Sequence, residues 1–161
     1  MWPSDDSMLT IAWQPQIRIT VRDLAGHVID VVERSNLIVT VGFSMLRDCL
    51  QGVVADAEIK YVAVGSDSTA PALADTVLGT ETFRKAVTSF SNPSATSLKT
   101  IMYIAPAEAV GAIAEIGWFA GAAAGAGADT GILVGRVLYS RVKTALESIQ
   151  VERTDTFSEV A

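Results

Sequence analysis

The side chains that most often carry out enzymatic chemistry are scarce in this sequence. His27 is the only histidine and Cys49 the only cysteine among the 161 residues. A serine–histidine–carboxylate triad would have to use His27, yet the chain contains no Gly-x-Ser-x-Gly segment of the kind that presents a serine nucleophile. A structural zinc site needs about four cysteine or histidine ligands. The sequence therefore predicts no nucleophilic catalysis and no zinc site, and we interpret His27 as a solvated residue in a turn.

Carboxylates are the next candidates for chemistry. Asp67, Asp75 and Glu81 could together surround a calcium ion, but the sequence lacks the Asp-x-Asp-x-Asp spacing of typical calcium loops. Glu81, three residues before Arg84, and Glu115, ahead of an apolar segment, admit two interpretations. They could act as catalytic acid and base, or they could form buried or interfacial ion pairs, as charged residues in apolar segments usually do. We favour ion pairs and expect no catalytic residue, metal or cofactor.

A glycine- and alanine-rich stretch at residues 120–130 invites comparison with phosphate-binding loops. It contains no Gly-Lys-Ser/Thr sequence, and no third glycine follows Gly125 and Gly127 as in a dinucleotide fingerprint. Because few of its side chains are bulky enough to build a core, we predict a surface loop that is flexible or makes a close backbone contact.

Charge and hydropathy restrict the partners. The net charge is −6 and the twelve basic residues are scattered, so we do not expect nucleic acid as a partner. Half of the residues are hydrophobic, which suggests apolar surface buried between subunits. Residues 101–128 are apolar, but Pro106, Glu108 and Glu115 interrupt them, so we predict no membrane segment. The N-terminus lacks the pattern of a signal peptide, which predicts folding in the cytoplasm, and we interpret Cys49 as a small buried residue.

Hydrophobic periodicity indicates mostly strands. Residues 17–22 and 28–33 alternate and flank a turn that contains Gly26, as in a β-hairpin. Within residues 37–50, apolar residues recur every four positions, which predicts one helix, capped by Ser35 and Asn36 and ended by Gly52. Further strands are predicted at residues 59–64, 81–91, 98–105, 115–119, 132–142 and 149–157.

The spacing of these strands predicts a mainly β fold, a single antiparallel β-sandwich or barrel-like domain with one α-helix in the N-terminal third. We place this domain at residues 16–161. Residues 1–15 show no period and are interpreted as an extended arm, whose Trp2 and Trp13 could dock on a neighbouring subunit or on their own domain.

Several residues are expected to shape the scaffold or an interface. Gly65 would let a strand stop sharply at a turn, and Leu78, Glu81 and Arg84 would place an apolar anchor and a charge pair at the start of the next strand. Glu115 would belong to an ion pair. Gly117 would leave room for the ring of Trp118 to lie across the backbone.

The order of these segments resembles that of small tail-associated proteins of tailed bacteriophages, described as tail-fibre-like or tail-collar-like. The resemblance covers about residues 28–157 and rests on segment order. The segments are Asn36-Leu37-Ile38-Val39, Ile59–Gly65 before a Ser/Thr/Ala-Pro loop, Asp75-Thr76 to Leu78, Glu81 with Arg84, Glu115-Ile116-Gly117-Trp118-Phe119, and Gly131–Arg136.

The resemblance implies a non-enzymatic virion protein, made in the host cytoplasm, at a tail, baseplate or fibre-attachment site. It would act by packing in a homo-oligomer, for which analogy with fibre-type appendages suggests a trimer, and against other virion proteins. Because no long shaft follows residue 157, an adaptor is expected rather than a whole fibre. Two alternatives remain: a capsid decoration protein on the head shell, and a receptor- or carbohydrate-binding module that stacks sugars on exposed Trp and Tyr.

Overall fold

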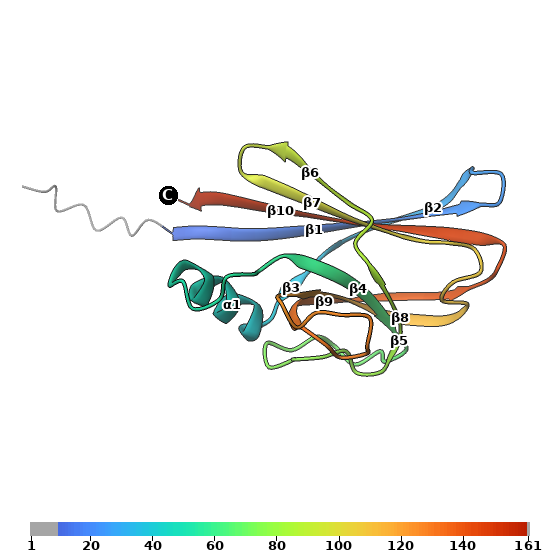
Figure 1. Ribbon diagram of the computed structural model, residues 1–161. Coiled ribbons are helices and arrows are strands. Elements are labelled where there is room, and N and C mark those ends of the chain that lie inside the picture. Colours follow the sequence, from blue (N-terminus) through green and yellow to red (C-terminus); the bar gives the residue numbers. More distant parts are fainter. Residues whose placement is uncertain (1–9, 161) are drawn as a thin grey trace, which may run out of the picture.

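The computed structural model describes residues 10–160, which form two five-stranded antiparallel sheets and one helix (Figure 1). The first sheet has the strand order β2-β1-β10-β7-β6 and the second has the order β3-β9-β8-β4-β5. The first sheet consists of β1 (Thr10–Asp23), β2 (Val28–Ser35), β6 (Ser89–Ser94), β7 (Ser97–Ile104) and β10 (Glu147–Val160). The second consists of β3 (Leu37–Ile38), β4 (Ile59–Gly65), β5 (Glu81–Ala86), β8 (Gly111–Ala120) and β9 (Ile132–Lys143). The mainly β fold class and the sandwich are confirmed.

The core of the sandwich forms because apolar side chains alternate along β1 and β10, and the pairing of the two strands places them on the same face. They pair along their whole length, from Thr10 opposite Val160 to Asp23 opposite Glu147. Ile17, Ile19 and Val21 face the second sheet beside Ile149 and Val151, and all five are at most 2% exposed. Since side chains on a strand alternate between its faces, the residues between them point outward.

The hairpin of β1 and β2 is confirmed, and Gly26 adopts the positive φ of +87° that its turn requires. The helix, α1 (Thr40–Leu50), packs on β9 and begins three residues later than predicted. Leu37 and Ile38 instead form β3 and pair with β9, so these two residues belong to the second sheet and the helix starts after them. The predicted cap is therefore wrong: the residue before the helix is Val39, which makes no side-chain capping bond.

One further prediction about this helix, the burial of Cys49, is wrong. Cys49 is exposed rather than buried, because the helix turns only Gly42 and Met45 fully toward the sheet. Gly42 allows close packing, since a Cβ there would lie 2.7 Å from the carbonyl oxygen of Val134. Within residues 10–160, no helix is long and apolar enough to span a membrane.

The segment predicted as one strand at residues 81–91 is two strands in different sheets. The N–H of Val87 donates to Lys60 in the second sheet, and the N–H of Thr88 donates to Ile101 in the first. The chain thus crosses between the sheets at this point. The residues at the crossing, Ala86-Val87-Thr88-Ser89, include no glycine, proline or asparagine, so no turn signal in the sequence revealed it.

The prediction of an extended arm at residues 1–15 is wrong for residues 10–15. Residues 10–15 belong to β1, where Trp13 lies opposite Phe157 of β10. Pro15 lies within this paired stretch and is buried on the same face as Trp13 and Ile17, so the alternation of apolar residues extends back from Ile17 through Pro15. Trp2 and the other residues of 1–9 lie outside the described part of the chain.

Candidate functional site

Arg136 on β9 is the centre of a buried charge cluster that fixes the loop of residues 66–80. Its Nε donates to Glu115 of β8 at 2.6 Å, its Nη1 to Asp75 at 3.0 Å, and its Nη2 to the carbonyl oxygen of Thr69 at 3.0 Å. Burial alone lowers the pKa of Arg136, but the hydrogen bonds to Glu115 and Asp75 outweigh it and raise that pKa. The cation is therefore permanent, and it ties the loop to the sandwich.

The carboxylate of Glu115 holds the same loop from inside. Glu115 is fully buried and accepts the backbone N–H groups of Gly79 and Thr80 at 3.0 and 2.9 Å. Gly65 ends β4 as predicted, and a side chain there would collide with Glu115 and lie 2.5 Å from the carbonyl oxygen of Thr80. Glu115 thus forms the buried ion pair that we favoured, with Arg136 as its partner.

Leu78 anchors the 66–80 loop by apolar contact. It is 3% exposed and packs with Phe119 and Leu133 on the outer face of the second sheet. A Cβ at Gly117 would lie 2.7 Å from Leu78 and 3.0 Å from Leu133, so these leucines occupy the space that Gly117 leaves. The prediction that the ring of Trp118 fills this space is wrong. Trp118 is the next residue along the strand and points to the opposite face, into the inter-sheet core.

Arg84 on β5 fixes a second loop, the glycine-rich loop of residues 121–131. It forms a two-pronged ion pair with Glu81, at 2.6 and 2.8 Å, and both side chains are almost fully buried. Its Nη1 donates to the carbonyl oxygens of Gly125 and Thr130 at 3.0 and 2.9 Å. Of the two alternatives expected for this loop, flexibility or a close backbone contact, the backbone contact is present, and Arg84 makes it.

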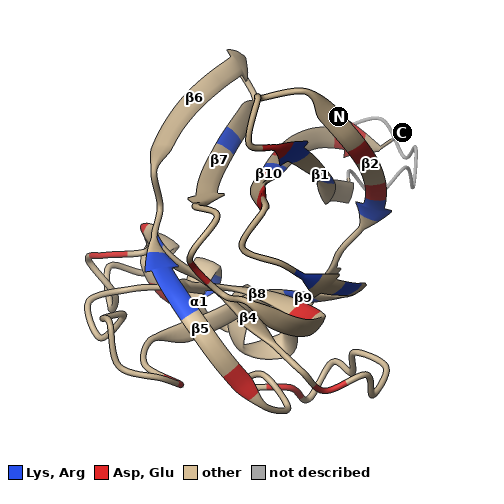
Figure 2. Cartoon of the chain, turned by 90° about the vertical axis from the view of Figure 1, so that its right-hand side faces the viewer, with Lys and Arg blue, Asp and Glu red and all other residues tan. Residues whose placement is uncertain are grey.

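The other charged residues also serve the scaffold. Arg141 joins Glu147 and Asp30, and the ammonium group of Lys143 donates to the carbonyl oxygens of Ala105 and Pro106. Burial lowers the pKa of Lys143. Figure 2 shows acidic and basic segments interspersed over both sheets and their loops.

The carboxylates considered for a calcium ion are divided between two arginines. Asp67 and Asp75 contact Arg136, whereas Glu81 contacts Arg84. Across residues 10–160, no three His, Cys, Asp or Glu side chains gather as a metal site would require. His27 lies exposed in the hairpin turn beside Asp23, as predicted.

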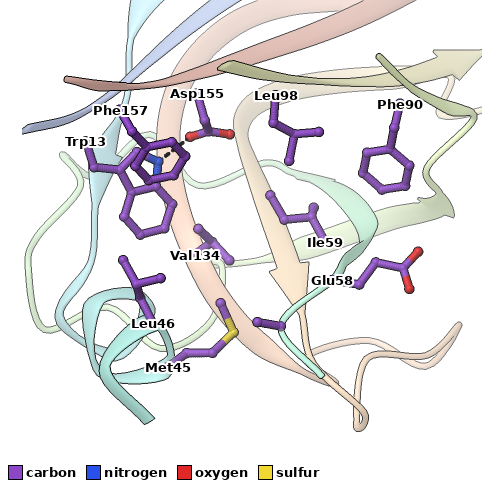
Figure 3. A pocket seen from close by; sticks show the side chains of 11 residues that line it. Trp13, Met45, Leu46, Glu58, Ile59, Phe90, Leu98, Val134, Asp155 and Phe157 are labelled. Carbon is purple, nitrogen blue, oxygen red and sulfur yellow. Dashed lines mark hydrogen bonds between the residues drawn. The ribbon is translucent and has the colours of Figure 1, made fainter. Parts of the chain in front are cut away.

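An apolar cleft of about 440 Å³ lies between the two sheets (Figure 3). It lies where β1 begins and β10 ends, and α1 closes one side of it. Apart from Glu58 and Asp155, its lining is apolar, and consists of Trp13, Met45, Leu46, Ala57, Ile59, Phe90, Leu98, Val134 and Phe157. A cavity of this size and lining is typical of sites that receive an apolar group.

A buried ion pair borders this cleft. Arg153 and Asp155 lie two residues apart on β10, and Nε and Nη2 of Arg153, one edge of its guanidinium group, donate to the Asp155 carboxylate at 2.7 to 3.0 Å. The guanidinium group lies 5.2 Å from the ring centre of Trp118 and 5.9 Å from that of Trp13. Trp13 in turn donates its Nε1–H to Asp155 at 2.6 Å and stacks on Phe157. This network fixes the indole of Trp13 at the wall of the cleft.

The predicted site residues therefore fall into three groups rather than one site. Gly65, Leu78, Glu115 and Gly117 hold the 66–80 loop, Glu81 and Arg84 hold the glycine-rich loop, and Trp13 and Trp118 flank Arg153. Sequence reasoning missed Arg136, Arg153 and Asp155. The signal for the last two was present, because they continue the inward-facing alternation of Ile149 and Val151.

Comparison of the chain with models of protein families, with curated proteins and with solved structures gives no significant match.

Proposed function

We propose that this protein is a non-enzymatic assembly module of a bacteriophage particle, placed in the tail, baseplate or fibre-attachment region. The resemblance of its segments to tail-associated proteins supports the location. The mode of action, packing against other subunits, is supported by one structural observation: the apolar cleft stays open at the end of the sandwich, where nothing in residues 10–160 fills it.

The distribution of charge supports the same mode of action. An active site needs polar groups that converge on a substrate, but the buried arginines and carboxylates here face one another and the loop backbones. A protein that works as a rigid support needs fixed loops and apolar contact surface, and this arrangement supplies both.

A capsid decoration protein remains the second candidate within the same class, because a rigid sandwich with a docking cleft would suit it equally well. A carbohydrate-binding module is less well supported. Sugar stacking needs exposed aromatic faces, whereas Trp118 is fully buried and Trp13 packs between Phe43 and Phe157.

Immunogold electron microscopy of intact particles with an antibody against this chain tests the proposal. Label confined to the tail or its tip is the expected result. Label spread evenly over the head would replace the tail assignment by decoration, and the absence of label from every particle would refute both. Adsorption of the isolated protein to host cells, in competition with particles, would instead favour the receptor-binding module.

A further inference from the structure

The apolar cleft continues into an exposed apolar surface on the same side of the molecule. Ile11 lies two residues before Trp13 on the same face of β1 and is 80% exposed. On α1, Phe43 packs edge-on against Trp13 at 5.8 Å and is itself 48% exposed, and Leu50 is 84% exposed. Figure 1 shows the ends of β1 and β10 above α1 on this side. We call these residues, together with the cleft, the docking face.

The chain supplies a segment whose composition matches this face. Residues 1–9 read Met-Trp-Pro-Ser-Asp-Asp-Ser-Met-Leu, with apolar side chains at both ends and polar ones between. The segment joins β1 at Thr10, three residues from Trp13 in the wall of the cleft. Nine extended residues span at most about 30 Å, which is ample to reach an adjoining subunit.

We propose that residues 1–9 of a second copy of this chain occupy the cleft, with Trp2 as the side chain that enters it. The inference rests on the proposed function, because it names the partner of the docking face within an oligomer. The direction of β1 favours a second copy. The strand passes the cleft wall at Trp13 and runs on outward to Thr10, so a return into the same cleft requires a reversal just before Thr10. A tight turn takes about four residues and would consume Met8 and Leu9, whereas a neighbour's cleft can receive the whole segment.

Exchange of residues 1–9 between copies would also give an oligomer of defined size. Each copy offers one segment and one cleft, and reciprocal exchange around a symmetry axis satisfies both without leaving an open end. Half of the residues are hydrophobic, which suggests more apolar surface than one core can bury, and this exchange buries such surface between copies.

The exposed Cys49 makes the contact testable by disulfide trapping. Cys49 follows Met45 by four residues and Leu46 by three, so it lies on the cleft side of α1, one turn further along the helix. One protein carries Ser4→Cys with Cys49→Ser, and a size-tagged second protein keeps its native Cys49. After mixing and mild oxidation with diamide, a mixed disulfide can form only if the segment of one copy reaches α1 of another.

We expect a mixed dimer on a non-reducing gel, and its loss when the second protein carries Ala57→Trp, which fills the cleft. The matched control places the new cysteine in the exposed hairpin turn at the far end of the sandwich, as Ala25→Cys with Cys49→Ser. An equal yield from this control would overturn the proposal. So would a trapped product confined to single chains when Ser4→Cys and the native Cys49 share one molecule. Circular dichroism of each variant checks that it is folded.

The result is independent of the location of the protein in the particle. Light scattering should give a multiple of 17.0 kDa for the full chain, and a monomer mass somewhat below 17.0 kDa for a protein that lacks residues 1–9. An unchanged oligomer after this deletion would overturn the docking proposal, while immunogold label on the tail would still support the proposed function. Loss of the oligomer after this deletion, together with no immunogold label on any particle, would support the docking proposal and refute the proposed function.

Discussion

Replacing Arg136 by methionine should destabilise the protein strongly, because it leaves the carboxylate of Glu115 buried beneath the 66–80 loop without its cationic partner. Methionine keeps much of the apolar volume but removes the donors to Glu115, Asp75 and Thr69. Removal of one partner from a buried ion pair typically costs about 3–5 kcal/mol. Glu115 retains three backbone N–H donors, so we expect the lower end, about 3 kcal/mol in the free energy of unfolding. For a domain of this size that lowers Tm by roughly 6–12 °C.

A double-mutant cycle in urea isolates the interaction. Glu115→Gln in the native background should also destabilise, because the amide cannot replace the charge that Arg136 faces. Added to Arg136→Met, the same change should be nearly neutral or stabilising, since it removes the stranded charge. The matched control is Arg18→Met, whose exposed pair with Glu33 should contribute less than about 1 kcal/mol.

Two outcomes would refute this reasoning. An unfolding free energy of Arg136→Met that equals that of Arg18→Met would mean that the cluster does not hold the 66–80 loop. An equal cost of Glu115→Gln in both backgrounds would mean that the two side chains do not interact.

Three further results are expected. Gly117→Val should lower the free energy of unfolding by about 1–3 kcal/mol through collision with Leu78, and Leu78→Ala should rescue part of that loss in a urea titration. Arg84→Lys should leave the core folded but expose the glycine-rich loop to limited proteolysis, because lysine lacks the forked donors; an unchanged cleavage pattern would contradict the role of Arg84. Hydrogen bonds from Arg141 and Lys85 hold the pKa values of Glu147 and Glu108 below their ordinary 4.5, so both bind protons more weakly when folded. Their contribution to the free energy of unfolding should be complete above pH 4.5 and should disappear as the pH falls through the lowered pKa values. A urea midpoint that does not change as the pH falls below 4.5 would contradict this.

The sequence predicted the elements whose formation depends on local pattern. Alternation along residues 17–22 and 28–33, with a glycine in the turn between them, was sufficient for the hairpin, because register and face follow from a period of two. The ion pair between Glu81 and Arg84 was also predictable, since its partners are three residues apart and part of one segment.

Other features depend on contacts between segments far apart in the sequence, and no local pattern contains them. The late start of α1 follows from the pairing of Leu37 and Ile38 with β9, about 100 residues further along the chain. The crossing between sheets at Val87 follows from hydrogen bonds to two different strands. The length of β1 follows from its pairing with β10, which carries the strand through Pro15, a residue that by itself argues against a strand interior.

The same division holds for the candidate site. Composition alone indicated that the chemistry-bearing residues were few. Alternation along β10 was also sufficient to place Arg153 and Asp155 on the inner face of their strand, although the sequence analysis did not use it for that purpose. Only the tertiary structure decided that Arg136, rather than another cation, neutralises Glu115, and that the sheets diverge enough beside α1 to leave an apolar cleft. The physical reason is that a strand's pattern specifies which way each side chain points, whereas its neighbour is chosen by the packing of the two sheets.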